Sequence, residues 1–135
     1  MGYVIFKNKY GHTYHKGFLL TTTKDGYIFF NYTCCVDILN KYGYKYARFL
    51  KSPDNNHFAI GLLRDKQERS DYKITFGNKN NTIAFISGRA FFRDINFDYH
   101  DTKKQYLISW DKQEELIEVD LTKRYISEKK NYESS

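Results

Sequence analysis

Short apolar runs alternating with polar turns fill the first half of the chain and predict a strand-rich fold. The runs favour aromatic and β-branched residues, as strands do, and Gly, Asn or Asp residues separate them. Between two of the runs the spacing becomes helical, because Cys35, Ile38 and Leu39 fall on one face of a short helix predicted over 34–41. The predicted strands of this half cover residues 2–6, 17–23, 27–30, 44–51 and 57–63.

Local signals mark the ends of this helix and the turn that follows it. Thr33 is the predicted N-cap, since a hydroxyl oxygen can accept a hydrogen bond from a free backbone N–H at a helix start. Gly43 is predicted to end the helix, because glycine readily adopts the left-handed conformation found there. Pro53 lies in the turn of residues 52–56 that joins the last two strands.

The second half repeats this order of elements. The predicted elements are strands over 72–76 and 82–86, a helix over 88–95 with Ser87 as its N-cap, and a hairpin of strands 106–110 and 116–121. The charged stretch 64–71 is the candidate connector between the halves. The chain thus divides into a first repeat with a basic N-terminal hairpin (1–63), the connector (64–71), a second repeat (72–121) and a polar tail (122–135).

The two repeats predict the fold class. The alignment matches Ile28 and Phe30 with Ile83 and Phe85, and Phe58 and Ile60 with Ile117 and Val119. A single repeat of this size cannot bury its own apolar face, so two must pack together. We therefore expect a mainly β (α+β) fold: a small barrel built from two β-β-α-β-β-like repeats, with two short helices at its ends.

The first repeat resembles the AbrB-type swapped-hairpin family of bacterial regulators and antitoxins, which belongs to the cradle-loop barrels. The matching positions are Gly26, Ile28, Phe30, Leu39, Gly43, Phe49 and Ile60, within a stretch of about 35 residues. Asn31 stands where the family has Pro, and the helix lacks the family's Arg. The resemblance implies tandem copies of the module in one chain. It also implies DNA binding through basic residues of the first lobe, for which Lys24, Lys45 and Arg48 occupy suitable places.

The positive charge of the chain is concentrated in its first third. The net charge is +6; residues 1–51 hold eight basic and two acidic residues, and the remainder holds fourteen of each. A concentrated positive field attracts phosphate or another polyanion. The alternative is that these side chains only keep the surface soluble.

Basic and aromatic residues interleave in the N-terminal hairpin, and basic residues recur along strand 44–51. This pattern suits a nucleic-acid backbone and its bases, but an edge strand protected by lysines has the same pattern. Most of the 13 Tyr and 11 Phe residues are explained as core or cross-strand aromatics, and Trp110 as a core or hairpin-flanking aromatic. The candidate nucleic-acid-binding residues are Lys7, Lys9, Tyr10, His12, Lys16, Lys24, Lys45, Arg48 and Lys51.

No motif in the sequence specifies a chemistry. There is no glycine-rich phosphate loop, no G-x-S-x-G and no pair of carboxylates in an apolar setting. His12 and His15 could begin a metal site with Cys34 and Cys35, but zinc sites usually space their cysteines by two or more residues. We therefore predict no catalytic residue, no metal and no cofactor.

The spacing of the cysteines and the length of the apolar runs bear on where in the cell the protein is expected. Two adjacent cysteines rarely bridge each other and form no disulfide framework, which favours a reducing environment. No apolar run has the length of a membrane span. We expect a cytoplasmic protein that does not enter a membrane, and the pattern leaves its oligomeric state open.

These observations lead to three hypotheses for function. The first is a small non-enzymatic DNA-binding protein, either a transcription regulator or a phage-encoded accessory factor, that contacts phosphates through its basic N-terminal lobe. The alternative is a protein-interaction module, such as a phage-encoded inhibitor of a host protein or a virion component. An enzyme that pairs Cys34 with His57 or His100 has the least support. The abundance of Lys, Asn and Ile fits an AT-rich genome, such as that of a low-GC bacterium or its phage.

Overall fold

Strands dominate the fold in the computed structural model, which describes residues 17–100 and 104–125. The predicted strand 2–6 lies outside these residues. The elements in chain order are β1 (Leu19–Thr22), β2 (Tyr27–Phe30), α1 (Tyr32–Cys34), η1 (Cys35–Asn40), β3 (Tyr46–Lys51), β4 (His57–Leu63), β5 (Tyr72–Lys73), β6 (Thr75–Phe76), β7 (Ala84–Ser87), α2 (Arg89–Asp94), β8 (Lys104–Asp111) and β9 (Leu116–Arg124). No helix among the described residues is long and apolar enough to cross a membrane.

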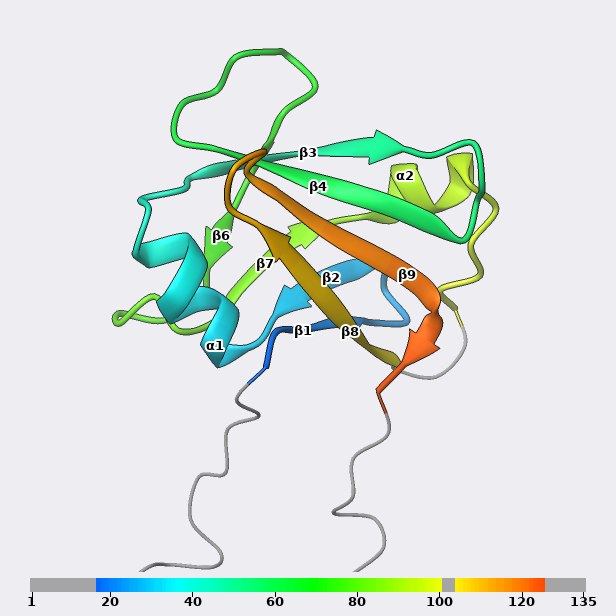
Figure 1. Cartoon of the computed structure of the whole chain (residues 1–135), viewed down its shortest axis with the longest axis horizontal. Coiled ribbons are helices and arrows are strands. Elements are labelled where there is room, and N and C mark those ends of the chain that lie inside the picture. Colours follow the sequence, from blue (N-terminus) through cyan, green and yellow to red (C-terminus); the bar gives the residue numbers. More distant parts are fainter. Residues whose placement is uncertain (1–16, 101–103, 126–135) are drawn as a thin grey trace, which may run out of the picture.

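All the strands belong to one antiparallel sheet that curls into a nearly closed barrel (Figure 1). Its order is β5-β3-β4-β9-β8-β1-β2-β7-β6, and its two ends, β5 and β6, are separated in the chain only by Ile74. β5 pairs with β3 and β6 pairs with β7. The N–H of Ile74 also donates to the carbonyl of Lys45 at 2.9 Å. Residues 72–76 therefore join both edges of the sheet, and the predicted small barrel of mainly β class is confirmed.

The pairing pattern is symmetric between the two halves of the chain. Strands β1 to β4 of the first half correspond in order to strands β6 to β9 of the second half. The β1–β2 pair then corresponds to the β6–β7 pair, and the β3–β4 pair to the β8–β9 pair. The β2–β7 pair and the β4–β9 pair each join two corresponding strands. The β1–β8 pair corresponds to the pairing of β3 with the segment of residues 72–76. Neither half therefore has a complete sheet of its own.

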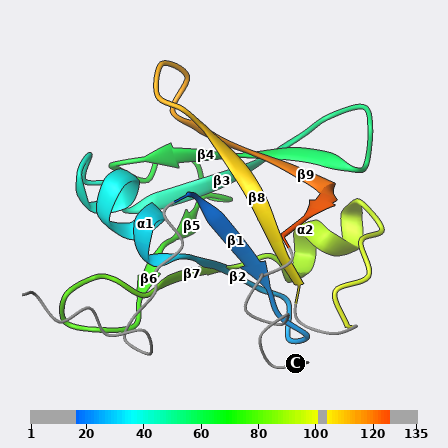
Figure 2. The same cartoon turned by 60° about the horizontal axis from the view of Figure 1, so that its bottom comes forward.

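The core fills the barrel and extends under the helices. Leu20 and Ile60 are completely buried inside it. Figures 1 and 2 show α1 and α2 on opposite sides of the strands. The helical segment after α1 contributes the buried Leu39, and α2 contributes Phe92. The barrel is thus covered by a short helix at each end, because the interior would otherwise be open to water.

Both helices begin at a different residue from the one predicted. Asn31, not Thr33, caps the first helix, because its Oδ1 accepts a hydrogen bond from the N–H of Cys34 at 3.0 Å. After one α-helical turn the chain continues in π-helical turns. The N-cap of α2 is Gly88, with no side-chain hydrogen bond, because the predicted cap Ser87 is the last residue of β7.

The predicted alignment of the repeats is wrong by one residue in β7. Ala84 and Ile86 face the core, whereas Ile83 is 46% exposed. Phe85 points to the outer face and stacks on Phe29 of β2, with ring centroids 4.9 Å apart. The apolar residues of β7 lie on both faces, so hydrophobicity alone does not reveal which face is inside.

A buried carboxylate fastens the charged connector to β3. The side chain of Asp71 is 1% exposed and accepts hydrogen bonds from Nε and Nη2 of Arg48, at 3.0 and 2.9 Å. Its Oδ2 also accepts from the backbone N–H groups of Gln67 and Glu68, at 3.0 and 2.8 Å. The bonded guanidinium of Arg48, helped by these N–H groups, lowers the pKa of Asp71 to about 2.

The substitution Asp71→Asn should lower the free energy of unfolding by about 2 kcal/mol at neutral pH, since it removes a buried charge-assisted pair. The pKa of Asp71 is lower in the folded state than in the unfolded state. Its contribution is therefore complete above the unfolded pKa of about 4 and is lost as the pH falls through about 2. Urea unfolding over this pH range measures the effect.

The control for this prediction is Asp65→Asn, which changes an exposed carboxylate of the same connector. It should leave the unfolding midpoint nearly unchanged. An Asp71→Asn variant as stable as the unaltered protein at neutral pH would show that the ion pair does not hold the connector.

Candidate functional site

Five of the predicted nucleic-acid-binding residues lie outside the described residues. The other four occupy different parts of the barrel. Lys24 is exposed in the turn between β1 and β2, and Lys45 is exposed just before β3, with its Nζ 5.8 Å from the centroid of the Phe76 ring. The five outside are Lys7, Lys9, Tyr10, His12 and Lys16.

The two predicted cations on β3 are already paired. Arg48 forms the two-bond contact with the buried Asp71. Nζ of Lys51 lies 2.8 Å from Oδ2 of Asp94 on α2, and both side chains are exposed. The structure therefore brings Arg48 and Lys51 onto one strand but couples each to a carboxylate, and it places Lys24 and Lys45 elsewhere.

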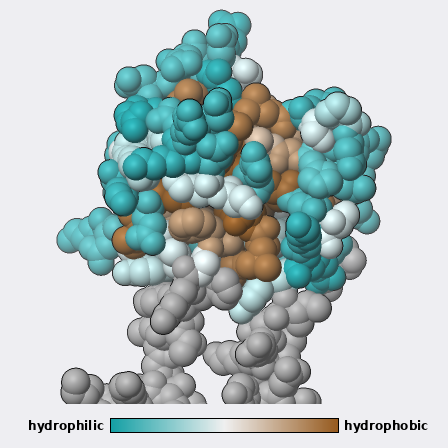
Figure 3. Space-filling view, viewed as in Figure 1, coloured by the Kyte–Doolittle hydropathy of each residue, from teal (hydrophilic) through white to brown (hydrophobic). Residues whose placement is uncertain are grey.

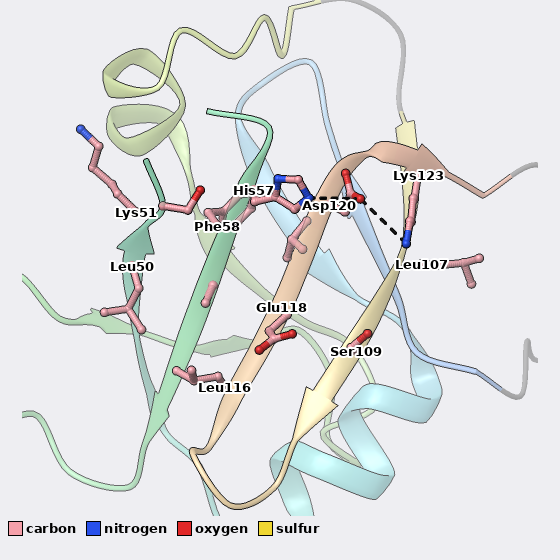
Figure 4. A pocket seen from close by; sticks show the side chains of 13 residues that line it. Leu50, Lys51, His57, Phe58, Leu107, Ser109, Leu116, Glu118, Asp120 and Lys123 are labelled. Atoms are coloured by element: carbon pink, nitrogen blue, oxygen red, sulfur yellow. Dashed lines mark ion pairs between the residues drawn. The ribbon is translucent and has the colours of Figure 1, made fainter. Parts of the chain in front are cut away.

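A shallow groove of about 430 Å³ lies on the outer face of β3, β4, β9 and β8 (Figure 4). The strand register aligns Leu50, Ala59, Glu118 and Ser109 across these four strands. Leu107 also lines the groove, and it is 46% exposed. Figure 3 shows apolar residues gathered in the middle of this side of the molecule, with hydrophilic residues around them. The groove therefore combines apolar side chains with Glu118 and Ser109, and it is not lined mainly by basic residues.

One end of the groove carries a histidine held between two carboxylates. Nδ1 of His57 lies 3.0 Å from Oδ2 of Asp54. On the other side, Nε2 of His57 lies 3.3 Å and Nζ of Lys123 lies 4.0 Å from Oδ2 of Asp120 (Figure 4). The N–H of Asn56, then His57, lowers the pKa of Asp54, and the hydrogen bonds of Thr122 lower that of Asp120. Both ring nitrogens of His57 therefore face carboxylates.

A second cluster lies at the end of the barrel where η1 leads to β3 and the β8–β9 turn approaches. It combines three aromatic rings with three cations, and we name it the aromatic–cation cluster. Lys41 and Lys112 are exposed, Tyr42 and Trp110 are partly exposed, and Tyr44 is buried. Its members are Lys41, Tyr42, Tyr44, Arg64, Trp110 and Lys112.

The helix end builds one side of this cluster. Gly43 has a φ of 70°, a conformation that costs glycine little. This turn lets the N–H of Tyr44 donate back to the carbonyl of Leu39 at 2.9 Å. The reversal places Tyr42 and Tyr44 in contact, with ring centroids 6.0 Å apart. The ring of Trp110 from β8 completes the cluster, 6.1 Å from Tyr42 and 5.9 Å from Tyr44.

The cations of the cluster lie close to its rings. Nζ of Lys41 and Nζ of Lys112 are 5.5 and 5.6 Å from the centroid of Tyr42, within the range of a cation–π contact. The guanidinium carbon of Arg64 lies 4.8 Å from the centroid of Tyr44. Among the described residues, Lys41 and Lys112 form no ion pair. These two ammonium groups are therefore available to an anion.

The carboxylate of Glu115 holds two members of the cluster, Tyr44 and Arg64, in place. Glu115 Oε1 accepts from the hydroxyl of Tyr44 at 2.9 Å and from Nη1 of Arg64 at 3.1 Å. Nε of Arg64 also donates to the carbonyl of Tyr42 at 2.7 Å. Burial, and then Glu115, raises the pKa of Tyr44 to about 12, so its hydroxyl stays protonated and keeps donating at neutral pH. The rings thus rest on a hydrogen-bonded support.

Sequence reasoning did not select this cluster. It treated Tyr42 and Gly43 as a helix end and Trp110 as a core or hairpin-flanking residue. Two sequence features could have pointed to the cluster: the tyrosines on either side of Gly43, and Trp110 two residues before Lys112. Nothing in the sequence links these two signals, because the segments meet only through the strand pairing.

The cysteines offer no reactive group in this structure. Cys34 and Cys35 are completely buried. Their sulfur atoms lie 3.6 and 3.8 Å from the carbonyls of Leu19 and Phe30. Burial raises the pKa of Cys34 to about 12 and that of Cys35 to about 11. Within the part of the chain that the structure describes, no group of three or more His, Cys, Asp or Glu residues could hold a metal ion.

Comparisons with protein-family models, curated proteins and solved structures find no match to this chain. The resemblance of the first repeat to the AbrB-type family therefore stays a prediction.

A thiol reagent such as Ellman's reagent should react slowly with the native protein at mildly alkaline pH. The reason is that only the thiolate attacks, and burial opposes its formation at both positions. Both thiols should react at once in denaturant, which serves as the control. Rapid reaction of either cysteine without denaturant would contradict this burial.

Proposed function

We propose that this protein is a small non-enzymatic nucleic-acid-binding protein and that the aromatic–cation cluster contacts the ligand. The observation that carries the proposal is the position of Lys41 and Lys112. Both ammonium groups lie within 6 Å of the Tyr42 ring centre and neither is neutralised by a carboxylate among the described residues. Cations beside partly exposed aromatic rings suit a ligand that has both phosphates and π-faces.

The overall charge supports a polyanionic ligand. The net charge of +6 favours the approach of a phosphate chain. The predicted residues Lys7, Lys9 and Lys16 add positive charge within a segment, 1–16, that contains no acidic residue. In this proposal that segment strengthens binding through phosphates, and DNA is the expected ligand.

The proposal changes the role of two predicted residues. Arg48 is bonded to the buried Asp71 and Lys51 is paired with Asp94, so neither is assigned to the ligand in this proposal. Lys45 and Lys24 remain exposed and can contribute to the field. The transcriptional or phage-related role of such a protein is a further hypothesis that follows from the binding activity.

A protein-interaction module is the second candidate function, and the groove favours it. Leu50 and Leu107 are 39% and 46% exposed at its border. Together with Ala59 and Leu116 they offer an apolar surface that could receive an apolar segment of a partner protein. A protein of this kind would bind no oligonucleotide, and Leu107→Asp would abolish its complex.

Binding of fluorescently labelled oligonucleotides, measured by anisotropy over a range of salt, tests the first candidate. The substitution Lys112→Gln should weaken binding at low salt. It should also reduce the slope of log K against log salt by about 1, since one phosphate contact is lost.

Lys123→Gln is the matched control for this experiment. Both lysines are exposed and belong to the same hairpin, but Lys123 lies at the groove, beside Asp120. The control should bind almost as tightly as the unaltered protein. If neither single-stranded nor duplex oligonucleotides bind at low salt, the proposed function is wrong.

A further inference from the structure

We propose that the ligand of the aromatic–cation cluster is single-stranded nucleic acid and that unpaired bases stack on the partly exposed rings of Tyr42 and Trp110. This inference rests on the proposed function and makes it more specific. It follows from the form of the cluster, from its charges and from the support beneath it.

The form of the cluster suits bases that are not already stacked. The rings of Tyr42 and Trp110 are 6.1 Å apart, are inclined by 35°, and are both partly exposed. They come from the end of η1 and from β8, so together they form a small platform at one end of the barrel. In a duplex the base faces are covered by neighbouring base pairs, so only an unpaired base can lie on such a platform.

The charges around the platform favour one strand over two. Three carboxylates occupy the nearby turn: Asp111, Glu114 and Glu115. Asp111 accepts from backbone N–H groups of its own turn, and Glu115 accepts from Tyr44 and Arg64, whereas Glu114 is exposed. A duplex carries a phosphate charge every ~1.7 Å along its axis and would meet these carboxylates as well as the lysines. A single strand can follow the lysines alone.

The carboxylates of the turn offset the cations of the cluster, so base stacking has to supply most of the affinity. A base stacked on an aromatic ring strengthens binding roughly 5- to 150-fold. Lys41 and Lys112 have flexible side chains, so their ammonium groups can move from the Tyr42 ring to the flanking phosphates while a base takes the ring face. The expected ligand is therefore bound mainly by its bases, with a weak dependence on sequence.

The platform is prepared before the ligand arrives. Arg64 holds the backbone of Tyr42 through its carbonyl and is itself held by Glu115. The buried Tyr44 packs edge-on against Trp110, with ring planes 72° apart. A support of this kind reduces the ordering that binding would otherwise require.

Trp110 is the only tryptophan in the chain, so its fluorescence reports directly on this site. Titration with a short oligothymidylate should quench the emission, because a thymine base stacks against the indole. The same titration with a duplex of equal length should give binding at least tenfold weaker and little quenching. The two titrations are read together with anisotropy of the labelled strand.

Variants separate stacking from general attraction. Tyr42→Ala should weaken binding of the single strand about tenfold, the loss expected for one stacked base. Trp110→Phe keeps an aromatic ring, so it should retain most of the affinity while removing the fluorescence signal. Tyr27→Ala is the matched control, since Tyr27 is an exposed tyrosine on β2, outside the cluster. Circular dichroism and thermal unfolding check that each variant is folded.

Each outcome decides a different proposal. Equal affinity for duplex and single strand, or an unaltered affinity in folded Tyr42→Ala, would overturn the single-strand inference and leave the proposed function intact. Absence of any binding to either ligand would overturn both. Single-strand preference with quenching and with loss in Tyr42→Ala, but not in Tyr27→Ala, supports the inference.

Discussion

The fold depends on the backbone hydrogen bonds of residues 72–76. This short segment pairs with β3 on one side and with β7 on the other, so it joins the two edges of the sheet. The buried Ile74 interrupts the strand at the point where the partner changes, and its N–H still bonds to Lys45. Without this junction the sheet would have two unpaired edges, which expose backbone donors and acceptors and invite association with other chains.

A closed barrel leaves its two ends to be covered, and the two ends are built differently. At the α2 end, Phe91 stacks on Phe49 with centroids 4.4 Å apart, and the nearby Lys51 is paired with Asp94. At the other end the buried Tyr44 lies beneath partly exposed rings, and the lysines there have no carboxylate partner among the described residues. Each end of the barrel therefore has to be covered. Ring packing beside an ion pair covers the α2 end, and the candidate ligand surface covers the other.

Most local elements were predicted from the sequence, but one strand face and both helix caps were not. Strands β2 and β4 have the predicted bounds, since each is a short apolar run between turn signals. The face of β7 was misjudged because Phe85 and Ile83 are apolar but point outward. Asn31 rather than Thr33 caps the first helix because an amide competes well with a hydroxyl for this role. These errors are local, and they do not alter the barrel.

The candidate site was beyond sequence reasoning for a different reason, which bears on how charge is interpreted. The excess of basic residues in the first third of the chain suggested that binding belongs to the first repeat. In the folded chain Arg48 and Lys51 are occupied by carboxylates from the connector and from α2. The exposed lysines of the cluster come from both repeats: Lys41 precedes β3, and Lys112 lies in the β8–β9 turn. The proposed ligand surface lies where the two halves of the chain meet, so the sheet and the proposed binding both use residues from both halves.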